Sequence, residues 1–195
     1  MDKFTKCSEW INRPEQFVAG DDEITFTTSP QTDMWQNTYY NFCRNNAHML
    51  LAETDRDYFS FTVKTRFQSK RRFDQCGIVL YIDEHNWLKA SIEYQNVMFQ
   101  RLGSVVTNRA FSDWATTDIP ASVKEMWYRL SRRGNDFLIE CSVDGITYNQ
   151  MRVCHIERAE GSVKFGIYAC SPEDSSFEAS FAHFNFGGCV WQEHK

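Results

Sequence analysis

Two short apolar segments joined by four polar residues constrain the fold of this chain most strongly. Residues 76–82 and 87–94 are rich in β-branched, aliphatic and aromatic side chains, and the turn-forming sequence Asp83-Glu84-His85-Asn86 lies between them. This arrangement predicts a β-hairpin. If Ile82 pairs with Trp87, the alternation of side chains places a polar set on one face, namely Asp74, Trp87, Lys89, Ser91 and Glu93. The opposite face is then apolar and suited to a core.

Further strands are predicted along the chain by the same alternation of apolar and polar residues. Residues 58–67, 125–132, 137–143 and 162–170 each carry it, and Asp144-Gly145 predicts a tight hairpin turn. The composition agrees, because 16 Phe, 8 Tyr and 6 Trp suit pleated strands better than helices. Residues 111–120 are expected to form a loop. We therefore expect one all-β domain over residues 1–195, with its core between about residues 8 and 188.

Several classes of partner are disfavoured by charge and hydropathy. The net charge of −5, with both signs interspersed, argues against nucleic acid, whose phosphates require a positive surface. Nothing approaches the roughly 18 apolar residues of a membrane span, and the N-terminal sequence does not resemble a secretory signal. The seven cysteines have no paired spacing, which favours reduced thiols and a cytoplasmic location.

The hairpin sequence DQCGIVLYIDEHNWLKASIEY (residues 74–94) resembles the signature of the DUF1349 family, also called the regulation-of-enolase family. Further motifs follow the order expected of that family: WINRPEQF, TDMWQNTYYNF, SDWAT, IYACSP and SFEASFAHFNF. The resemblance implies a concanavalin A-like jelly roll, a β-sandwich of two curved antiparallel sheets. Related folds bind carbohydrate on the concave sheet, so the resemblance makes that sheet the expected site.

A ligand-binding pocket is predicted where polar and aromatic side chains converge. Lys89 and Glu93 share a face with Asp74, and Trp127 and Arg129 share a face of their own strand. Indoles suit the apolar faces of sugar rings, whereas charged groups suit hydroxyls. The competing interpretation is that Glu93 only neutralises Lys89 or Arg129 on a partly buried sheet. The candidate ligand-binding residues are Trp35, Asp74, Gln75, Lys89, Glu93, Trp127 and Arg129.

Catalytic and cofactor sites have little support in the residues. The histidines are widely spread, with no spacing that suits a metal, and no glycine-rich phosphate loop occurs, so no metal or cofactor is expected. A glycoside hydrolase would need two nearby carboxylates, for which Glu93 and Asp74 are the candidates. Three functions remain open: binding of a carbohydrate or other small polar metabolite, regulatory interaction with a metabolic enzyme such as enolase, as the family name suggests, and hydrolysis by Glu93 and Asp74.

Overall fold

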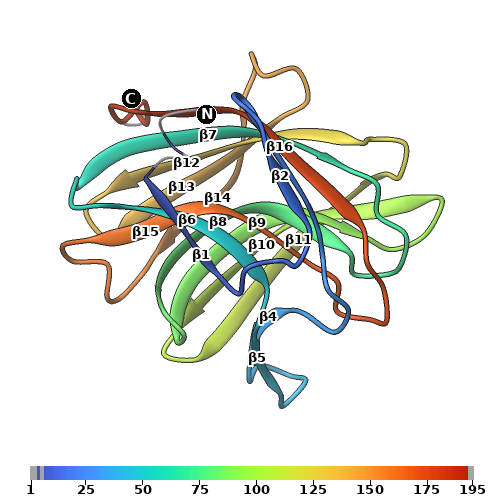
Figure 1. Cartoon of the computed structure of the whole chain (residues 1–195). Coiled ribbons are helices and arrows are strands. Elements are labelled where there is room, and N and C mark those ends of the chain that lie inside the picture. The colour runs from blue at the N-terminus through green and yellow to red at the C-terminus, as the bar shows by residue number, and fades with distance from the viewer. Residues whose placement is uncertain (1–3, 5–6, 193–195) are drawn as a thin grey trace.

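The chain folds into a sandwich of two large β-sheets (Figure 1). The computed structural model describes residue 4 and residues 7–192, and every element named in that part is a strand. Sheet 1 contains, in spatial order, β1 (Ser8–Ile11), β6 (His48–Thr54), β15 (Val163–Cys170), β8 (Gln75–Asp83), β9 (Asn86–Tyr94), β10 (Phe99–Asn108) and β11 (Phe111–Pro120). Sheet 2 contains β14 (Asn149–His155), β13 (Asp136–Ser142), β12 (Glu125–Arg133), β7 (Tyr58–Phe67), β16 (Glu178–Gly187), β3 (Glu23–Thr27) and β2 (Phe17–Ala19).

Neighbouring strands in both sheets pair in the antiparallel direction, and a small separate hairpin of β4 (Met34–Gln36) and β5 (Cys43–Asn45) completes the fold. In Figure 1 this hairpin projects beyond the end of the sandwich. The all-β jelly-roll sandwich expected from the alternation and the resemblance is confirmed. The six strands predicted at residues 58–67, 76–82, 87–94, 125–132, 137–143 and 162–170 are confirmed to within a residue or two at their ends.

The core lies between the sheets and is built from the apolar side of each alternating strand. Phe59, Phe61 and Val63 of β7 are fully buried in one cluster with Ile78 of β8 and Phe165 of β15. Each large side chain buried in this way stabilises the fold by roughly 1.5–3 kcal/mol relative to exposure. The outward side of sheet 1 also buries apolar side chains, in a second and smaller cluster. This second cluster shows that the outer face of sheet 1 is covered by other parts of the chain.

The register of the central hairpin differs from the predicted one. Leu80 pairs with Leu88 instead of Lys89, because the strand bulges between Tyr81 and Asp83. A bulge adds one residue to one strand, and a one-residue slip moves every side chain of that strand to the opposite face. Hence Gln75, Gly77, Val79 and Tyr81 share the outer face with Trp87, Lys89, Ser91 and Glu93.

The expectation of a loop at residues 111–120 is wrong. These residues form β11, which pairs with β10 along its whole length and lies at the edge of sheet 1. Most of its side chains are exposed. An exposed edge strand has no core-facing row to impose an apolar alternation, and the sequence therefore lacks the usual signal of a strand.

Two glycines in the middle of sheet 1 sit where the backbones of neighbouring strands approach closely. A Cβ atom on Gly77 would lie 1.9 Å from the carbonyl oxygen of Ala90, and one on Gly166 would lie 2.0 Å from that of Leu50. Gly77 and Gly166 lie on adjacent strands, β8 and β15. Glycine in a strand commonly marks a bend or a close approach of backbone. We conclude that these glycines shape sheet 1 beneath the covered outer face.

All seven cysteines are free thiols in the structure. Three of them, Cys76, Cys141 and Cys170, are buried. In the described part of the chain, no helix is long and apolar enough to span a bilayer.

Candidate functional site

A pocket of about 300 Å³ opens on the outer face of sheet 1. Strands β8, β9, β10 and β11 form its base, the β4–β5 hairpin forms one wall, and the segment after β15 contributes the rim. The side chains that line it are mainly aromatic on the walls and polar at the base. They are Asp33, Trp35, Tyr40, Phe42, Arg44, Phe73, Gln75, Lys89, Glu93, Val105, Trp114, Pro172 and Glu173.

The β4–β5 hairpin is fastened to sheet 1 by hydrogen bonds at several points. The backbone N–H of Gln36 donates to Ser112 Oγ at 3.0 Å, and the Asn37 side chain donates to the Ala110 carbonyl at 2.8 Å. On the other side, Arg44 donates to the carbonyl of Pro172 at 3.3 Å. These contacts hold the aromatic wall of the pocket in place, because the hairpin is tied to both the β11 side and the segment after β15.

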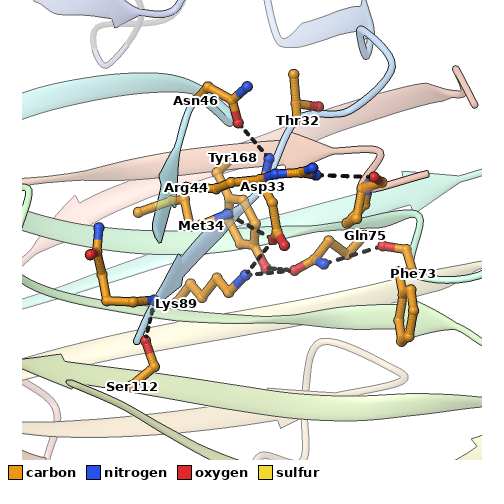
Figure 2. A network of polar contacts seen from close by, with 12 residues as sticks. Thr32, Asp33, Met34, Arg44, Asn46, Phe73, Gln75, Lys89, Ser112 and Tyr168 are labelled. Atoms are coloured by element: carbon orange, nitrogen blue, oxygen red, sulfur yellow. Dashed lines mark hydrogen bonds and ion pairs between the residues drawn. The ribbon is translucent and has the colours of Figure 1, made fainter. Parts of the chain in front are cut away.

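A chain of polar contacts forms the base of the pocket (Figure 2). The ammonium group of Lys89, whose side chain is only 4% exposed, donates to Gln75 Oε1 at 2.9 Å and lies 3.6 Å from Asp33 Oδ1. The hydroxyl of Tyr168 donates to the same Gln75 oxygen at 3.0 Å, and the Gln75 amide donates to the Phe73 carbonyl at 3.2 Å. A buried charge needs such partners to avoid a large desolvation cost. The network therefore holds a cation, a carboxylate and an amide in fixed positions beneath the aromatic walls.

Glu93 is a pocket carboxyl whose pKa is strongly displaced. Burial raises its pKa to about 7, which Lys89 partly opposes and the nearby Asp33 carboxylate reinforces. The Gln95 amide donates to Glu93 Oε1 at 3.0 Å. Near neutral pH both forms of this carboxyl are therefore populated: the protonated form can donate a hydrogen bond, whereas the ionised form can only accept one.

Aromatic rings surround this polar base. The rings of Trp35 and Trp114 meet edge to face with centroids 6.4 Å apart, and Tyr40 packs against Trp35 at 5.5 Å. The Trp35 indole N–H donates to the Thr38 carbonyl at 3.0 Å, which fixes the ring. Rigid aromatic walls above a polar base can receive a ligand that has apolar ring faces and hydroxyl edges.

Four of the seven residues predicted to form a site are brought together by the structure. Trp35, Gln75, Lys89 and Glu93 all line this pocket. Lys89 and Glu93 face outward because β9 follows the predicted alternation, whereas Gln75 faces outward because of the bulge in β8.

Asp74 does not join them, so this part of the prediction is wrong. Its carboxylate is fully buried, and Oδ2 accepts hydrogen bonds from the backbone N–H groups of Lys70 and Arg71 at 2.8 and 2.9 Å. Ser175 Oγ donates to the same oxygen at 3.1 Å. Asp74 therefore fastens the turn that precedes β8 to the loop before β16, because its side chain points away from the face that Gln75 presents.

Trp127 and Arg129 are also wrongly placed by the prediction. Both lie on β12, which belongs to sheet 2, so they cannot meet a pocket on the outer face of sheet 1. The Trp127 ring stacks on His183 with centroids 5.1 Å apart. Arg129 donates two hydrogen bonds to Glu140, at 2.6 and 2.8 Å, instead of pairing with Glu93. Alternation along one strand cannot reveal which sheet the strand joins.

The sequence interpretation missed other residues of the pocket, among them Asp33, Tyr40, Phe42 and Trp114. Asp33, Tyr40 and Phe42 occur within the quoted motif TDMWQNTYYNF, and Trp114 occurs within SDWAT. Two features could have indicated them: the aromatic density of the first motif, and the position of both motifs outside the alternating strands. Among the described residues, no group of three or more His, Cys, Asp and Glu side chains is arranged to hold a metal ion.

Comparison with known proteins places the chain in a family. A family model described as "Protein of unknown function (DUF1349)" matches residues 10–189. The chain belongs to the DUF1349 family. A relative from Saccharomyces cerevisiae (strain ATCC 204508 / S288c) named "Regulation of enolase protein 1" is 30% identical over 187 residues, which are 94% of this chain and 91% of the relative.

Solved structures extend the comparison of this DUF1349 chain to its fold. The crystal structure of a functionally unknown protein from Saccharomyces cerevisiae superposes with a TM-score of 0.89 at 27% identity, covering 96% of this chain and 99% of that one. The GH43 protein BlXynB from Bacillus licheniformis gives a TM-score of 0.74 at 14% identity, over 95% of this chain but only 38% of that longer chain. The alginate lyase from Klebsiella pneumoniae gives 0.59 at 10% identity, over 91% and 86%. The last two similarities concern the fold alone.

Proposed function

We propose that this protein binds a small neutral polyhydroxylated ligand, most simply a carbohydrate, in the pocket on the outer face of sheet 1. The observation that carries the proposal is the pairing of aromatic walls with a fixed polar base in a pocket of about 300 Å³. Trp35, Tyr40 and Trp114 offer apolar surfaces for a sugar ring, and Lys89 and Glu93 offer a donor and a titrating carboxyl for its hydroxyls.

The charges at the base favour a neutral ligand. Lys89 already has the Asp33 carboxylate at 3.6 Å, so the base does not present an unpaired cation to an anionic ligand. Arg44 and Glu173, of opposite sign, both lie at the rim. A ligand without charge can fill the pocket without placing a like charge beside Lys89 or Asp33.

The test is binding of a panel of neutral sugars, measured by isothermal titration calorimetry with the wild-type protein and two tryptophan variants. We expect Trp35→Ala to weaken binding by about 1–3 kcal/mol, because it removes a wall of the pocket. Trp127→Ala is the matched control, since Trp127 lies on sheet 2, and its affinity should equal that of the wild type. Equal losses in the two variants, or no binding of any sugar by the wild type, would contradict the proposal.

The hydrolase alternative is not carried forward, because it required Glu93 and Asp74 to act on one bond. Glu93 lines the pocket, whereas Asp74 is buried beneath the turn that precedes β8. General acid and base groups must both reach the reacting atoms. We therefore propose a binding role without catalysis by this pair.

A second candidate function is regulation of a metabolic enzyme, and the name of the relative "Regulation of enolase protein 1" favours it. We expect purified enolase to change in turnover or in melting temperature when this protein is added in equimolar amount and in excess. Unchanged values at every ratio would contradict this candidate. A partner enzyme must share a compartment with the protein, and the cytoplasm remains the expected location.

A further inference from the structure

The pocket is bordered by a second, adjoining depression. Its lining includes Thr38, Tyr39 and Asp113, and it shares Trp35, Tyr40 and Trp114 with the pocket itself. The two depressions therefore adjoin at three aromatic residues that line both of them. A ligand longer than one ring could occupy both depressions by extending over these shared residues.

The second depression is lined mainly by aromatic and hydroxyl groups, and the single charge in its lining is paired with a cation. Asp113 is the one charged residue among its lining residues, and Arg152 lies 2.8 Å from its carboxylate. The lining therefore resembles the walls of the pocket but lacks the lysine and carboxyl pair of its base. Such a surface suits the apolar face of another neutral ring.

Tyr39 stands at the outer end of this depression and is 84% exposed. An aromatic side chain that is exposed to water at the tip of a hairpin adds no stability through burial. Its backbone conformation is also unfavourable. Tyr39 adopts a left-handed conformation, with φ of 63°, which is unfavourable for an aromatic residue, whereas Asn37 and Asn41, with φ of 51° and 54°, tolerate that region. Strained conformations of this kind persist where the surrounding structure holds them, and they concentrate at ligand-binding positions.

The tip is held by its own hydrogen bonds. Asn37 N–H donates to the Phe42 carbonyl at 3.0 Å, and Asn41 N–H donates to the Asn37 carbonyl at 3.0 Å. The ring centroid of Tyr40 lies 4.9 Å from that of Tyr39 and 5.5 Å from that of Trp35. The aromatic row from Trp35 to Tyr39 is therefore a continuous surface that leads outward from the pocket.

We propose that the second depression is an additional subsite, and that the ligand is a neutral oligosaccharide of at least two sugar rings. One ring lies in the pocket over Lys89 and Glu93, and the next lies against Tyr39 and Tyr40. This inference rests on the proposed carbohydrate-binding function and adds the length of the ligand to it.

The test compares glucose and xylose with their β-1,4-linked oligomers of two to four units, by calorimetry, on the wild type and on Tyr39→Ala. We expect the wild type to bind an oligomer more tightly than its monomer, and Tyr39→Ala to lose roughly three- to tenfold in affinity for the oligomer. Its affinity for the monomer should stay within about twofold, because Tyr39 is not among the residues that line the pocket. Tyr58→Ala is the control, since Tyr58 is a tyrosine of sheet 2 that is 63% exposed.

The outcomes separate this inference from the proposed function. If monomers bind and oligomers bind no more tightly, the second subsite is wrong and the pocket proposal stands. If no monomer or oligomer binds, the pocket proposal fails and the inference fails with it. If Tyr39→Ala leaves every sugar affinity unchanged but removes an effect on enolase, the hairpin tip contacts a protein, and the oligosaccharide subsite is wrong.

Discussion

Replacement of Gly77 by alanine is expected to lower the free energy of unfolding by about 3 kcal/mol or more, although it adds only one methyl group. The added Cβ would lie 1.9 Å from the Ala90 carbonyl oxygen and 2.8 Å from the Ser91 Cα. Both atoms belong to the backbone of β9, so no flexible side chain can move aside. Relief requires β8 and β9 to separate, which would break the hydrogen bonds of the strand pair beneath the pocket.

The measurement is equilibrium unfolding in urea, with Gly187→Ala as the matched control. Gly187 also lies in a strand, β16, but no heavy atom lies within 4 Å of the Cβ that would be added there. The control should therefore be nearly neutral. We also expect Gly77→Ala to bind sugar less well, because Gln75 and Lys89 are carried by the two strands that must separate. If Gly77→Ala lowers the free energy of unfolding no more than Gly187→Ala does, the backbones of β8 and β9 do not constrain position 77, and the prediction is wrong.

Replacement of Glu93 by glutamine is expected to stabilise the protein at pH 8. Burial raises the pKa of this carboxyl from its ordinary value of 4.5 to about 7, so the folded state binds a proton more tightly than the unfolded state does. Between these two pH values the wild type must lose stability as the pH rises. The gap corresponds to about 3 kcal/mol, at roughly 1.4 kcal/mol per pH unit. Glutamine does not ionise, so the variant should lack this loss.

The prediction is tested by unfolding free energies measured at intervals from pH 4 to pH 9. The advantage of Glu93→Gln over the wild type should grow between pH 4.5 and 7 and then level off. Glu178→Gln is the control, because Glu178 is exposed on β16. The competing interpretation from the sequence, in which Glu93 serves as the partner of a cation, predicts the opposite result. A variant that melts below the wild type at pH 8 would support that ion pair and contradict the dominance of burial.

The same titration connects stability to ligand binding. Protonated Glu93 can donate a hydrogen bond to a sugar hydroxyl, whereas the ionised form can only accept one. Ionisation of this carboxyl lowers the free energy of unfolding. Binding-site groups commonly lower stability in this way, because they are positioned to contact a ligand and not to stabilise the fold. Asp74 offers a contrast, since Oδ2 of its buried carboxylate accepts hydrogen bonds from two backbone N–H groups and from Ser175, which gives it a structural role.

The strands of this protein could be predicted from the sequence because alternation is a local property. In β7, the buried Phe59, Phe61 and Val63 alternate along a single strand, so the sequence alone shows which side meets the core. The outward direction of Lys89 and Glu93 on β9 follows from the same rule. The motif at residues 74–94, together with the further motifs in the expected order, indicates the family and, through it, the two-sheet sandwich.

The composition of the pocket was decided by tertiary structure. Of the neighbouring candidates Asp74 and Gln75, the bulge between Tyr81 and Asp83 brings Gln75 to the pocket and turns Asp74 away, because the two faces of a strand alternate with a period of two residues. Trp127 and Arg129 alternate as predicted, but the topology places β12 in sheet 2. The β4–β5 hairpin brings Asp33 within 3.6 Å of Lys89, although 56 positions separate them in the printed sequence. Contacts over such separations depend on how the strands are ordered and fastened, and local patterns carry no information about that order.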